Sequence, residues 1–243
     1  MALLEAHAIA ASFGGPMVLD DISFNVDAGA VTGLIGPNGA GKTTIFNILT
    51  GLQAPVAGSI WLDGHDITRL SPHRRAQRGL SRTFQRLELF GSLSVRDNVR
   101  VAGDIRNHWR RGRDMDAAAE TERVIDRLGL KDVAERQVSQ LPTGRARLVE
   151  VGRALMTRPR VLLLDEPASG QSDAETATFG DLLRDLAAEG IGICLVEHDM
   201  SLVMEVCHQI HVLDYGRMIA SGHPDDIRTN AGVVAAYLGD EAT

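Results

Sequence analysis

The segment that most constrains the fold of this chain is Gly36-Pro-Asn-Gly-Ala-Gly-Lys-Thr43. Two glycines bracket four residues and are followed by Lys and Thr, which is the phosphate-loop pattern. The apolar run from Ala30 to Ile35 precedes it, and the residues from Thr43 to Leu49 predict a helix that ends at Gly51. A strand, a glycine-rich turn and a helix in this order surround phosphate oxygens with backbone N–H groups and the positive end of the helix dipole. The segment therefore predicts an α/β fold that binds phosphate groups.

Single residues of this loop have expected roles. Lys42 is expected to reach the β- and γ-phosphates of a nucleotide, and Thr43 to ligate Mg²⁺. The predicted nucleotide-binding residues here are Gly36, Pro37, Asn38, Gly39, Ala40, Gly41, Lys42, Thr43 and Thr44. The alternative, a surface turn with a solvated lysine, is disfavoured because a predicted strand precedes the loop and a predicted helix follows it.

An apolar run that ends in two acids is the second constraint. The segment Val161-Leu-Leu-Leu-Asp-Glu166 has the composition of a buried strand with two carboxylates at its end. We expect Asp165 to bind a metal-bound water and Glu166 to act on the attacking water. Apolar strands that end in acids are common, so this prediction depends on the phosphate loop about 120 residues earlier.

The order of elements indicates a β/α core with a helical insertion. Short apolar runs predict strands at 3–13, 17–26, 30–35, 59–62, 161–164, 191–196 and 210–213. Residues 174–189 are predicted to form a helix between two of these strands, which is typical of a parallel sheet. From about 87 to 158 the chain is polar, charged and helix-prone, with helices expected at 116–128 and 145–157.

The charge of the chain limits its possible partners. Lys and Arg number 25 against 32 Asp and Glu, a formal net charge of −7, which argues against nucleic acid as a partner. No apolar stretch approaches the ~20 residues of a membrane span, so we expect a cytoplasmic protein. Two basic runs are interpreted as solvated helical faces, or as contacts with a membrane subunit or lipid headgroups. One is Arg106, Arg110, Arg111 and Arg113 around Trp109, and the other is Arg74, Arg75, Arg78, Arg82 and Arg86.

Five ordered motifs carry a resemblance to a known family. Besides the phosphate loop and the acidic strand end, these are Arg82-Thr-Phe-Gln85, Leu141-Pro-Thr-Gly144 and Glu197-His-Asp199. Over essentially its whole length the chain resembles the nucleotide-binding subunits of ATP-binding-cassette (ABC) transporters. The resemblance implies one ABC ATP-binding domain at 1–243. Its fold class is α/β, a P-loop NTPase core with an antiparallel β subdomain and a helical subdomain inserted at about 87–158.

The resemblance also implies roles for residues, with ATP and Mg²⁺ as cofactors. Phe13 stands where the family places an aromatic residue that stacks on adenine, and Gly144 belongs to a loop that serves the opposite subunit's nucleotide. Gln85 is implied to sense Mg²⁺ and the lytic water, and His198 to contact the γ-phosphate. The implied catalytic residues are Lys42, Gln85, Glu166 and His198, and the implied metal-binding residues are Thr43, Gln85 and Asp165.

Three stretches resemble one branch of the family more closely. They are Ser81–Gln85, Val196–Val203 and Ala236–Asp240, which are similar to the ATPases of branched-chain amino-acid importers (Liv-type) and urea-type relatives. This implies an ATP-hydrolysing subunit of an importer for branched-chain amino acids or a related small polar solute, peripheral on the inner face of the cell membrane. Its implied partners are a second ABC ATPase subunit, membrane permease subunits and, indirectly, a solute-binding protein.

Two loops depart from the family's usual pattern, in which the signature begins Leu-Ser-Gly-Gly-Gln. Here Pro142 replaces the Ser, Thr143 the first Gly and Arg145 the Gln, while Gly144 is kept. After the acidic strand end, Ser172 stands where Asp is usual. Because both loops serve the opposite nucleotide in the family, we predict a heterodimer in which this chain contributes weakly to the partner's site; a homodimer with harmless variation is the alternative.

The sequence also predicts where a membrane subunit docks, and it leaves two alternative functions open. The apolar residues Leu87, Leu89 and Phe90 directly follow Gln85, so we expect a membrane subunit to dock there. One rival is a soluble ABC ATPase outside transport, which predicts a second cassette, a long coiled coil or a basic surface. The other is a regulatory nucleotide-binding subunit with weak turnover, which Glu166 and His198 disfavour and Pro142 and Ser172 favour.

Overall fold

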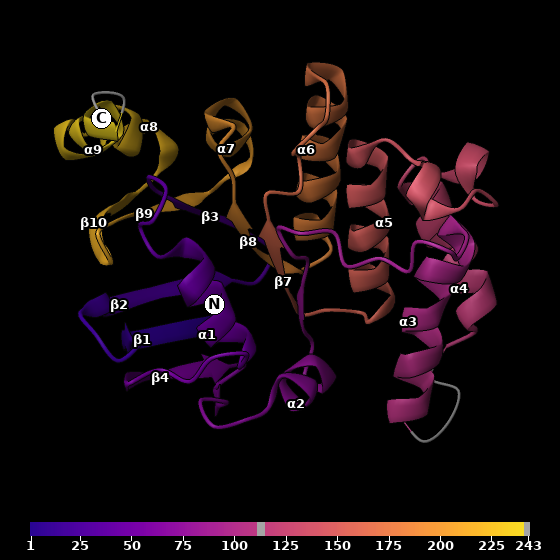
Figure 1. Ribbon diagram of the computed structural model, residues 1–243, viewed down its shortest axis with the longest axis horizontal. Coiled ribbons are helices and arrows are strands. Elements are labelled where there is room, and N and C mark those ends of the chain that lie inside the picture. Colours follow the sequence, from indigo (N-terminus) through magenta and orange to yellow (C-terminus); the bar gives the residue numbers. More distant parts are fainter. Residues whose placement is uncertain (111–114, 241–243) are drawn as a thin grey trace.

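The computed structural model describes residues 1–110 and 115–240 and is built on two sheets (Figure 1). An antiparallel sheet has the order β2-β1-β4-β5: β1 is Ala2–Ser12, β2 Met17–Asp27, β4 Ala57–Leu62 and β5 His65–Asp66. The second sheet has the order β10-β9-β3-β8-β7-β6: β3 is Val31–Ile35, β6 Leu80–Arg82, β7 Val161–Asp165, β8 Gly192–Val196, β9 Gln209–Asp214 and β10 Arg217–Gly222.

In the second sheet, β6, β7, β8, β3 and β9 run parallel, and β10 adds an antiparallel edge. Every residue of β3, β7 and β8 is buried, because both faces of this sheet are covered. Along β7, Leu162 and Leu164 pack into the core on one face and Leu163 into the core on the other. Parallel pairing brings the carboxyl ends of β3, β6, β7 and β8 to one edge of the sheet.

Helices and the antiparallel sheet cover the two faces. Helix α1 (Lys42–Thr50) shares a core with the antiparallel sheet on one face. On the other face lie α5 (Thr143–Met156), α6 (Asp173–Ala188) and α7 (Met200–Val206). Figure 1 shows α1 between the two sheets and α6 and α7 on the opposite side of the parallel sheet. The predicted fold class is confirmed by this arrangement.

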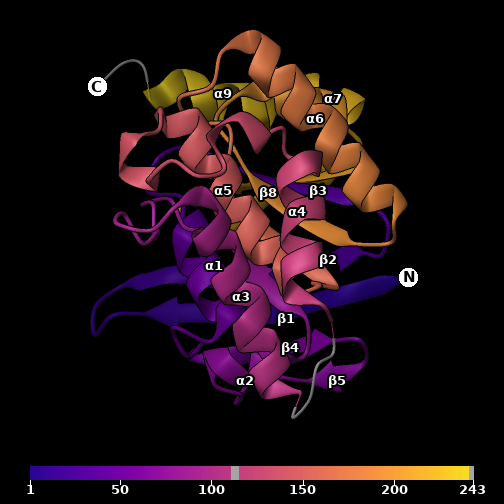
Figure 2. The same ribbon diagram turned by 90° about the vertical axis from the view of Figure 1, so that its right-hand side faces the viewer.

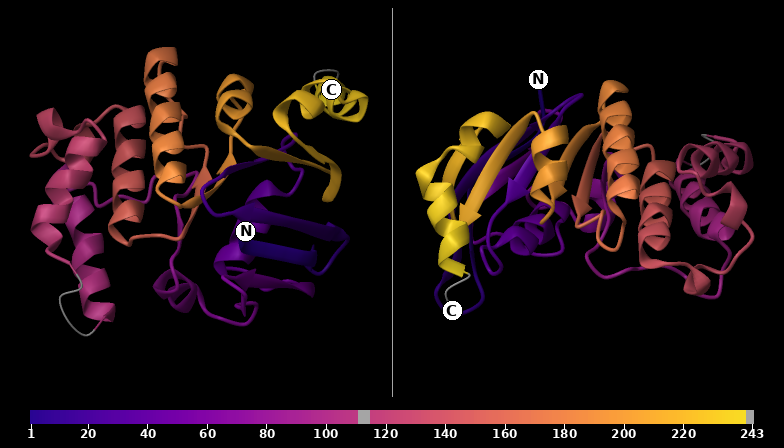
Figure 3. Two further views of the ribbon diagram at one scale, coloured as in Figure 1. Left: turned by 180° about the vertical axis from the view of Figure 1, so that it is seen from behind. Right: turned by 90° about the horizontal axis from the view of Figure 1, so that it is seen from above.

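One end of the molecule is helical. Helices α3 (Val95–Trp109) and α4 (Ala117–Arg127) pack with α5 there, as Figure 2 shows from that side. Their first turns are capped, since Ser94 Oγ accepts from the N–H of Asp97 and the Asp116 carboxylate accepts from two amides. The short helix α2 (Pro72–Gln77) precedes this end in the chain, whereas α8 (Pro224–Arg228) and α9 (Ala231–Asp240) lie at the opposite end (Figure 3).

The basic run 74–86 is a solvated face only in part, because Arg74, Arg78 and Arg86 are exposed whereas the side chains of Arg75 and Arg82 are buried. Arg75 is only 2% exposed, and its guanidinium donates to the carbonyls of Ile48 and Leu49 at 2.6 Å each, at the end of α1. A cation is favourable there because the last carbonyls of a helix lack partners within the helix. Burial lowers the pKa of Arg75 to about 10. The side chain of Arg82 is also buried, so the prediction of a solvated face is wrong for Arg75 and Arg82. Arg111 and Arg113 lie outside the described residues.

Candidate functional site

A cavity of about 300 Å³ lies at the edge of the parallel sheet where the strands end. Segments far apart in the chain line it: the phosphate loop with the start of α1, the loop after β6, the end of β7 and the loop after β8. The lining residues are Val18, Asn38, Gly39, Ala40, Gly41, Lys42, Thr43, Thr44, Gln85, Asp165, Glu166, Val196 and His198. Eleven of these thirteen were singled out from the sequence; Val18 and Val196 were not assigned to the site.

The phosphate loop needs glycine at two positions for steric reasons. Gly36 has a φ of +150°, and a Cβ there would lie 2.0 Å from the carbonyl oxygen of Leu213. Gly41 has a φ of +108°, and its Cβ would lie 2.6 Å from Cδ2 of Leu19. A Cβ at Gly36 would require β9 or the loop to move, whereas a Cβ at Gly41 would displace the Leu19 side chain and strain a backbone with positive φ. The loop is therefore shaped by the strands packed around it.

Lys42 is held across the loop. Its Nζ donates to the carbonyl oxygens of Gly36 at 2.5 Å and of Pro37 at 2.9 Å, and the residue is only 7% exposed. Helix α1 begins at Lys42 with no side chain capping its first amides and no acidic residue in its first turn. Uncapped amides and a fixed ammonium group at one helix start favour an anion with several oxygens, such as a di- or triphosphate.

Asp165 ends β7 in a buried, cationic setting. Its Oδ2 accepts from Arg82 Nη2 at 2.8 Å, and its backbone N–H donates to Thr83 Oγ1 at 3.2 Å. The same cavity is lined by Thr43 and Gln85, so a hydroxyl, a carboxylate and a side-chain amide face one space. Oxygen donors of these kinds are those that Mg²⁺ takes together with water and phosphate oxygens, so this set fits a Mg²⁺ ion.

Glu166 contacts two of the other predicted catalytic side chains. Its Oε1 accepts from Gln85 Nε2 at 3.0 Å and lies 3.0 Å from His198 Nε2. The Glu166 side chain is 18% exposed and that of His198 48%, so both remain open to the cavity. Glu166 itself has a φ of +50°, uncommon for a residue with a side chain, and its N–H donates to Val196 on the neighbouring strand. The carboxylate of Glu166 is thus in contact with both Gln85 and His198.

Glu197 holds two backbone segments next to the site through hydrogen bonds. No role was predicted for it from the sequence. Its carboxylate accepts from the N–H groups of Ala168 at 2.7 Å and His198 at 3.0 Å, and so ties the loop after β7 to the loop after β8. Burial raises the pKa of Glu197, and these backbone donors counteract the shift. The sequence signal was an acid directly before His198 at the end of an apolar strand.

Four predicted ligand residues do not line the cavity: Gly36 and Pro37 at the start of the phosphate loop, and Phe13 and Gly144 in other segments. Phe13 stands in the turn after β1, is 67% exposed and does not line it. Gly144 lies in the first turn of α5 and lines a different cavity of about 560 Å³ between α4, α5 and α6. Within this one chain, the signature loop and the phosphate loop therefore do not face the same space.

The departures in these loops have local structural consequences. Pro142 is the N-cap of α5 and offers no side-chain hydrogen bond to it. Ser172, by contrast, is the N-cap of α6 and forms a capping box with Glu175. Arg145 pairs with Asp132 at 2.6 Å. Ser172 and Arg145 thus have structural partners in this chain, whereas Pro142 leaves a helix start uncapped.

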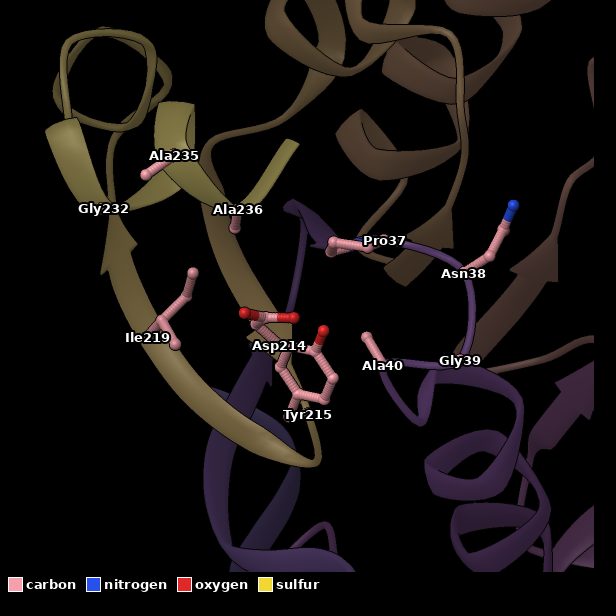
Figure 4. Close-up of a pocket in the computed structure, with 10 residues that line it drawn as sticks. All are labelled: Pro37, Asn38, Gly39, Ala40, Asp214, Tyr215, Ile219, Gly232, Ala235 and Ala236. Carbon is pink, nitrogen blue, oxygen red and sulfur yellow. The ribbon is translucent and has the colours of Figure 1, made fainter. Parts of the chain in front are cut away.

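A third cavity borders the first residues of the phosphate loop, Pro37–Ala40. It measures about 510 Å³ and lies between the loop, the β9–β10 turn and α9 (Figure 4). Tyr215 and Asp214 extend from the turn toward Ala40, and Gly232, Ala235 and Ala236 form the helical wall. It shares Asn38, Gly39 and Ala40 with the first cavity but contains none of Lys42, Asp165 or Glu166.

The chain is similar to known ATP-binding proteins throughout its length. A sequence model described as "ABC transporter" matches residues 19–169, and one described as "Branched-chain amino acid ATP-binding cassette transporter" matches 217–243. The chain is 37% identical to the high-affinity branched-chain amino acid transport ATP-binding protein BraF of Pseudomonas aeruginosa, with 98% of each covered. It is 32% identical to the lipopolysaccharide export system ATP-binding protein LptB of Haemophilus influenzae, with 99% of each covered. A crystal structure of a nucleotide-free ATP-binding cassette from an ABC transporter matches with a TM-score of 0.87 and 28% identity, covering 98% of this chain and 99% of that one.

Proposed function

This chain belongs to the ATP-binding proteins of ABC transporters, and from that membership we propose that it powers the import of branched-chain amino acids or a related small polar solute. As a member of this ATPase family it binds and hydrolyses ATP. Two observations support the cargo class: the match of residues 217–243 to the branched-chain family, and the similarity to BraF. The identity of 37% to BraF, against 32% to the lipopolysaccharide export protein LptB, favours amino-acid transport over lipopolysaccharide export.

The convergence on Glu166 carries the catalytic part of the proposal. Lys42 and the amides of the phosphate loop bind the β- and γ-phosphates and offset the charge that develops on their oxygens. Glu166 accepts a proton from, or orients, the attacking water, while Gln85 and His198 hold that water and the carboxylate in place. Thr43, Asp165 and Gln85 would hold Mg²⁺, which when bound neutralises phosphate charge.

We further propose that a second ABC ATPase subunit completes the nucleotide site, with a heterodimer favoured. Gly144 lies outside this chain's own phosphate cavity, so its loop is available to a nucleotide held by another subunit. Exposed Phe13 is accessible to an adenine ring that extends beyond the cavity. Pro142 lacks the hydroxyl that the family's usual Ser offers, and this supports unequal contributions from the two subunits.

The membrane permease is proposed to dock beside Gln85, on the cytoplasmic face of the membrane. Leu87 and Leu89 pack against the core, whereas Phe90 is 47% exposed beneath the Arg153 guanidinium. A groove of about 320 Å³ lies close by, lined in part by Phe84 and Ile105. Across residues 1–110 and 115–240, no helix is both long and apolar enough to cross a membrane.

The Glu166→Gln exchange tests the catalytic assignment. We expect ATP turnover to fall by about 10²-fold or more, because general-base catalysis contributes about 10² to 10⁴. Nucleotide affinity should be retained, since the phosphate-binding groups are untouched. The matched control is Glu189→Gln, at an exposed carboxylate that pairs with Arg127 far from the cavity. Turnover in the Glu166→Gln variant equal to that of the control would overturn the role of Glu166.

Reconstitution tests cargo and partners. The chain, a second ATPase subunit, the permease subunits and the solute-binding protein are assembled in lipid vesicles, and ATP turnover is measured with leucine, urea or lipopolysaccharide. Stimulation by leucine with ATP-dependent uptake is the expected result. A chain that turns over ATP alone and gains nothing from permease and cargo would instead be a soluble ABC ATPase.

A further inference from the structure

We propose that Arg82 is a positioning residue that holds Asp165 in place and weakens the affinity of the adjoining site for a divalent cation. The inference rests on the proposed role of Asp165 in holding Mg²⁺. From the sequence, Arg82 was expected as part of a motif and in a basic run interpreted as a solvated face or as a contact with a membrane subunit or lipid headgroups. The structure gives it a specific set of partners.

Arg82 joins three elements at one point. It ends β6, its Nη2 donates to Asp165 Oδ2 on β7 at 2.8 Å, and its Nη1 donates to Asn47 Oδ1 on α1 at 2.7 Å. The guanidinium carbon lies 5.3 Å from the ring centre of Phe46 and 4.9 Å from that of Phe84. Two polar bonds in different directions and two aromatic contacts fix the plane of the guanidinium, and with it one oxygen of Asp165.

The pair is also shielded from water. The side chain of Arg82 is 5% exposed and that of Asp165 is 2% exposed. Coulombic coupling between such groups is screened far less than at the surface. A cation this close compensates much of the charge of the carboxylate, so Asp165 attracts Mg²⁺ less than an unpaired aspartate would.

The position of the pair makes the effect specific to this site. Asp165 lines the phosphate cavity, and Arg82 lines the groove proposed for the permease, so their contact belongs to the wall between the two. Phe84, which stacks on Arg82, directly precedes Gln85. A change at the groove that moves Arg82 therefore changes the charge beside the metal ligand without any contact with nucleotide.

The test compares the affinity of the full-length chain for a fluorescent non-hydrolysable ATP analogue in Mg²⁺ and in EDTA. The ratio of the two affinities reports the contribution of the cation, because direct effects of Arg82 on the phosphates enter both measurements. In Arg82→Gln the ratio is expected to rise by about three- to tenfold, since a nearby positive charge is removed. Arg82→Lys keeps the charge and should hold the ratio within about twofold, although one ammonium group cannot bridge Asn47 and Asp165.

Arg153→Gln is the matched control, because Arg153 lines the same groove and stacks on Phe90, with no bond to Asp165 among the described residues. Its ratio should stay at the parent value. An unchanged or lower ratio in Arg82→Gln, with a folded chain by thermal unfolding, overturns the proposal. Asp165→Asn distinguishes the proposed role of Asp165 from that of Arg82. If the ratio is unchanged in Asp165→Asn, Asp165 does not hold Mg²⁺. If the ratio falls in Asp165→Asn but does not rise in Arg82→Gln, only the role of Arg82 is overturned.

Discussion

The phosphate loop and the signature-like loop differ in what holds their shape. At the phosphate loop, Gly36 is closed in by the carbonyl of Leu213 and Gly41 by the side chain of Leu19. At the signature-like loop, the nearest atoms to a Cβ on Gly144 are Cγ of Gln171 at 3.0 Å and the carbonyl oxygen of Gly170 at 3.1 Å. The first loop is built by this chain's own strands, whereas the second faces out of the phosphate cavity.

The phosphate loop and the signature-like loop should therefore tolerate different substitutions within this chain. At Gly36 and Gly41 the strands packed around the phosphate loop leave no room for a Cβ, whereas Gly39 lies in open space. The signature-like loop has changed at three positions, and its own chain loses only a helix cap at Pro142. In the proposed dimer a partner subunit sets the constraint on that loop, so variants of the two loops should fail in different assays.

The largest effect is expected from Gly36→Ala. A Cβ 2.0 Å from a backbone oxygen forces β9 or the loop to move, which should lower the free energy of unfolding by about 3 kcal/mol and abolish nucleotide binding. Thermal unfolding and nucleotide titration of the isolated chain measure both. Gly39→Ala is the control, because an added Cβ at Gly39 would have no atom within 4 Å. Only the backbone strain of a φ of +80° remains, which should lower the free energy of unfolding by about 1 kcal/mol. Equal losses in the two variants would mean that the close packing of Gly36 is unimportant.

Gly144→Ala should leave the isolated chain nearly intact. The Gln171 side chain and the carbonyl of Gly170 must each shift slightly, so we expect a loss of stability of about 1 kcal/mol and an unchanged nucleotide affinity. In the assembled pair, turnover should fall by about tenfold or more, since backbone donors would be displaced from the opposite phosphate. Loss of nucleotide binding in the isolated chain would show that Gly144 acts in cis.

The smallest effect is expected from Pro142→Ser. A hydroxyl at the N-cap of α5 stabilises by about 1 kcal/mol, and the loss of proline rigidity offsets part of it, which leaves a gain of about 0.5 kcal/mol. The φ of −56° and ψ of 149° at this position suit a Ser cap. Turnover of the assembled pair should rise if Pro142 weakens the partner's site. A pair with unchanged turnover and ATP affinity would favour harmless variation.

Much of the fold followed from local patterns. The helices expected at 43–49 and 174–189 are α1 at Lys42–Thr50 and α6 at Asp173–Ala188, because apolar spacing and a terminal glycine mark both. The three-residue strand β6 was not expected, since Leu80-Ser-Arg82 has no pattern of its own and is a strand only through pairing with β7. Helix α7 was also missed, a seven-residue helix whose capping residue Asp199 had been assigned to a motif.

The phosphate loop, the acidic strand end and the α/β class could be predicted from short stretches of the chain. These depend on properties within a few residues of each other: positive φ at glycine, free amides at a helix start and apolar runs that favour buried strands. Other contacts could not be predicted without the tertiary structure. Arg82 pairs with Asp165, 83 residues away, and Arg75 caps the end of α1. Glu166 contacts both Gln85 and His198. Those contacts depend on which strands become neighbours in the sheet, and strand order is set by packing across the whole molecule.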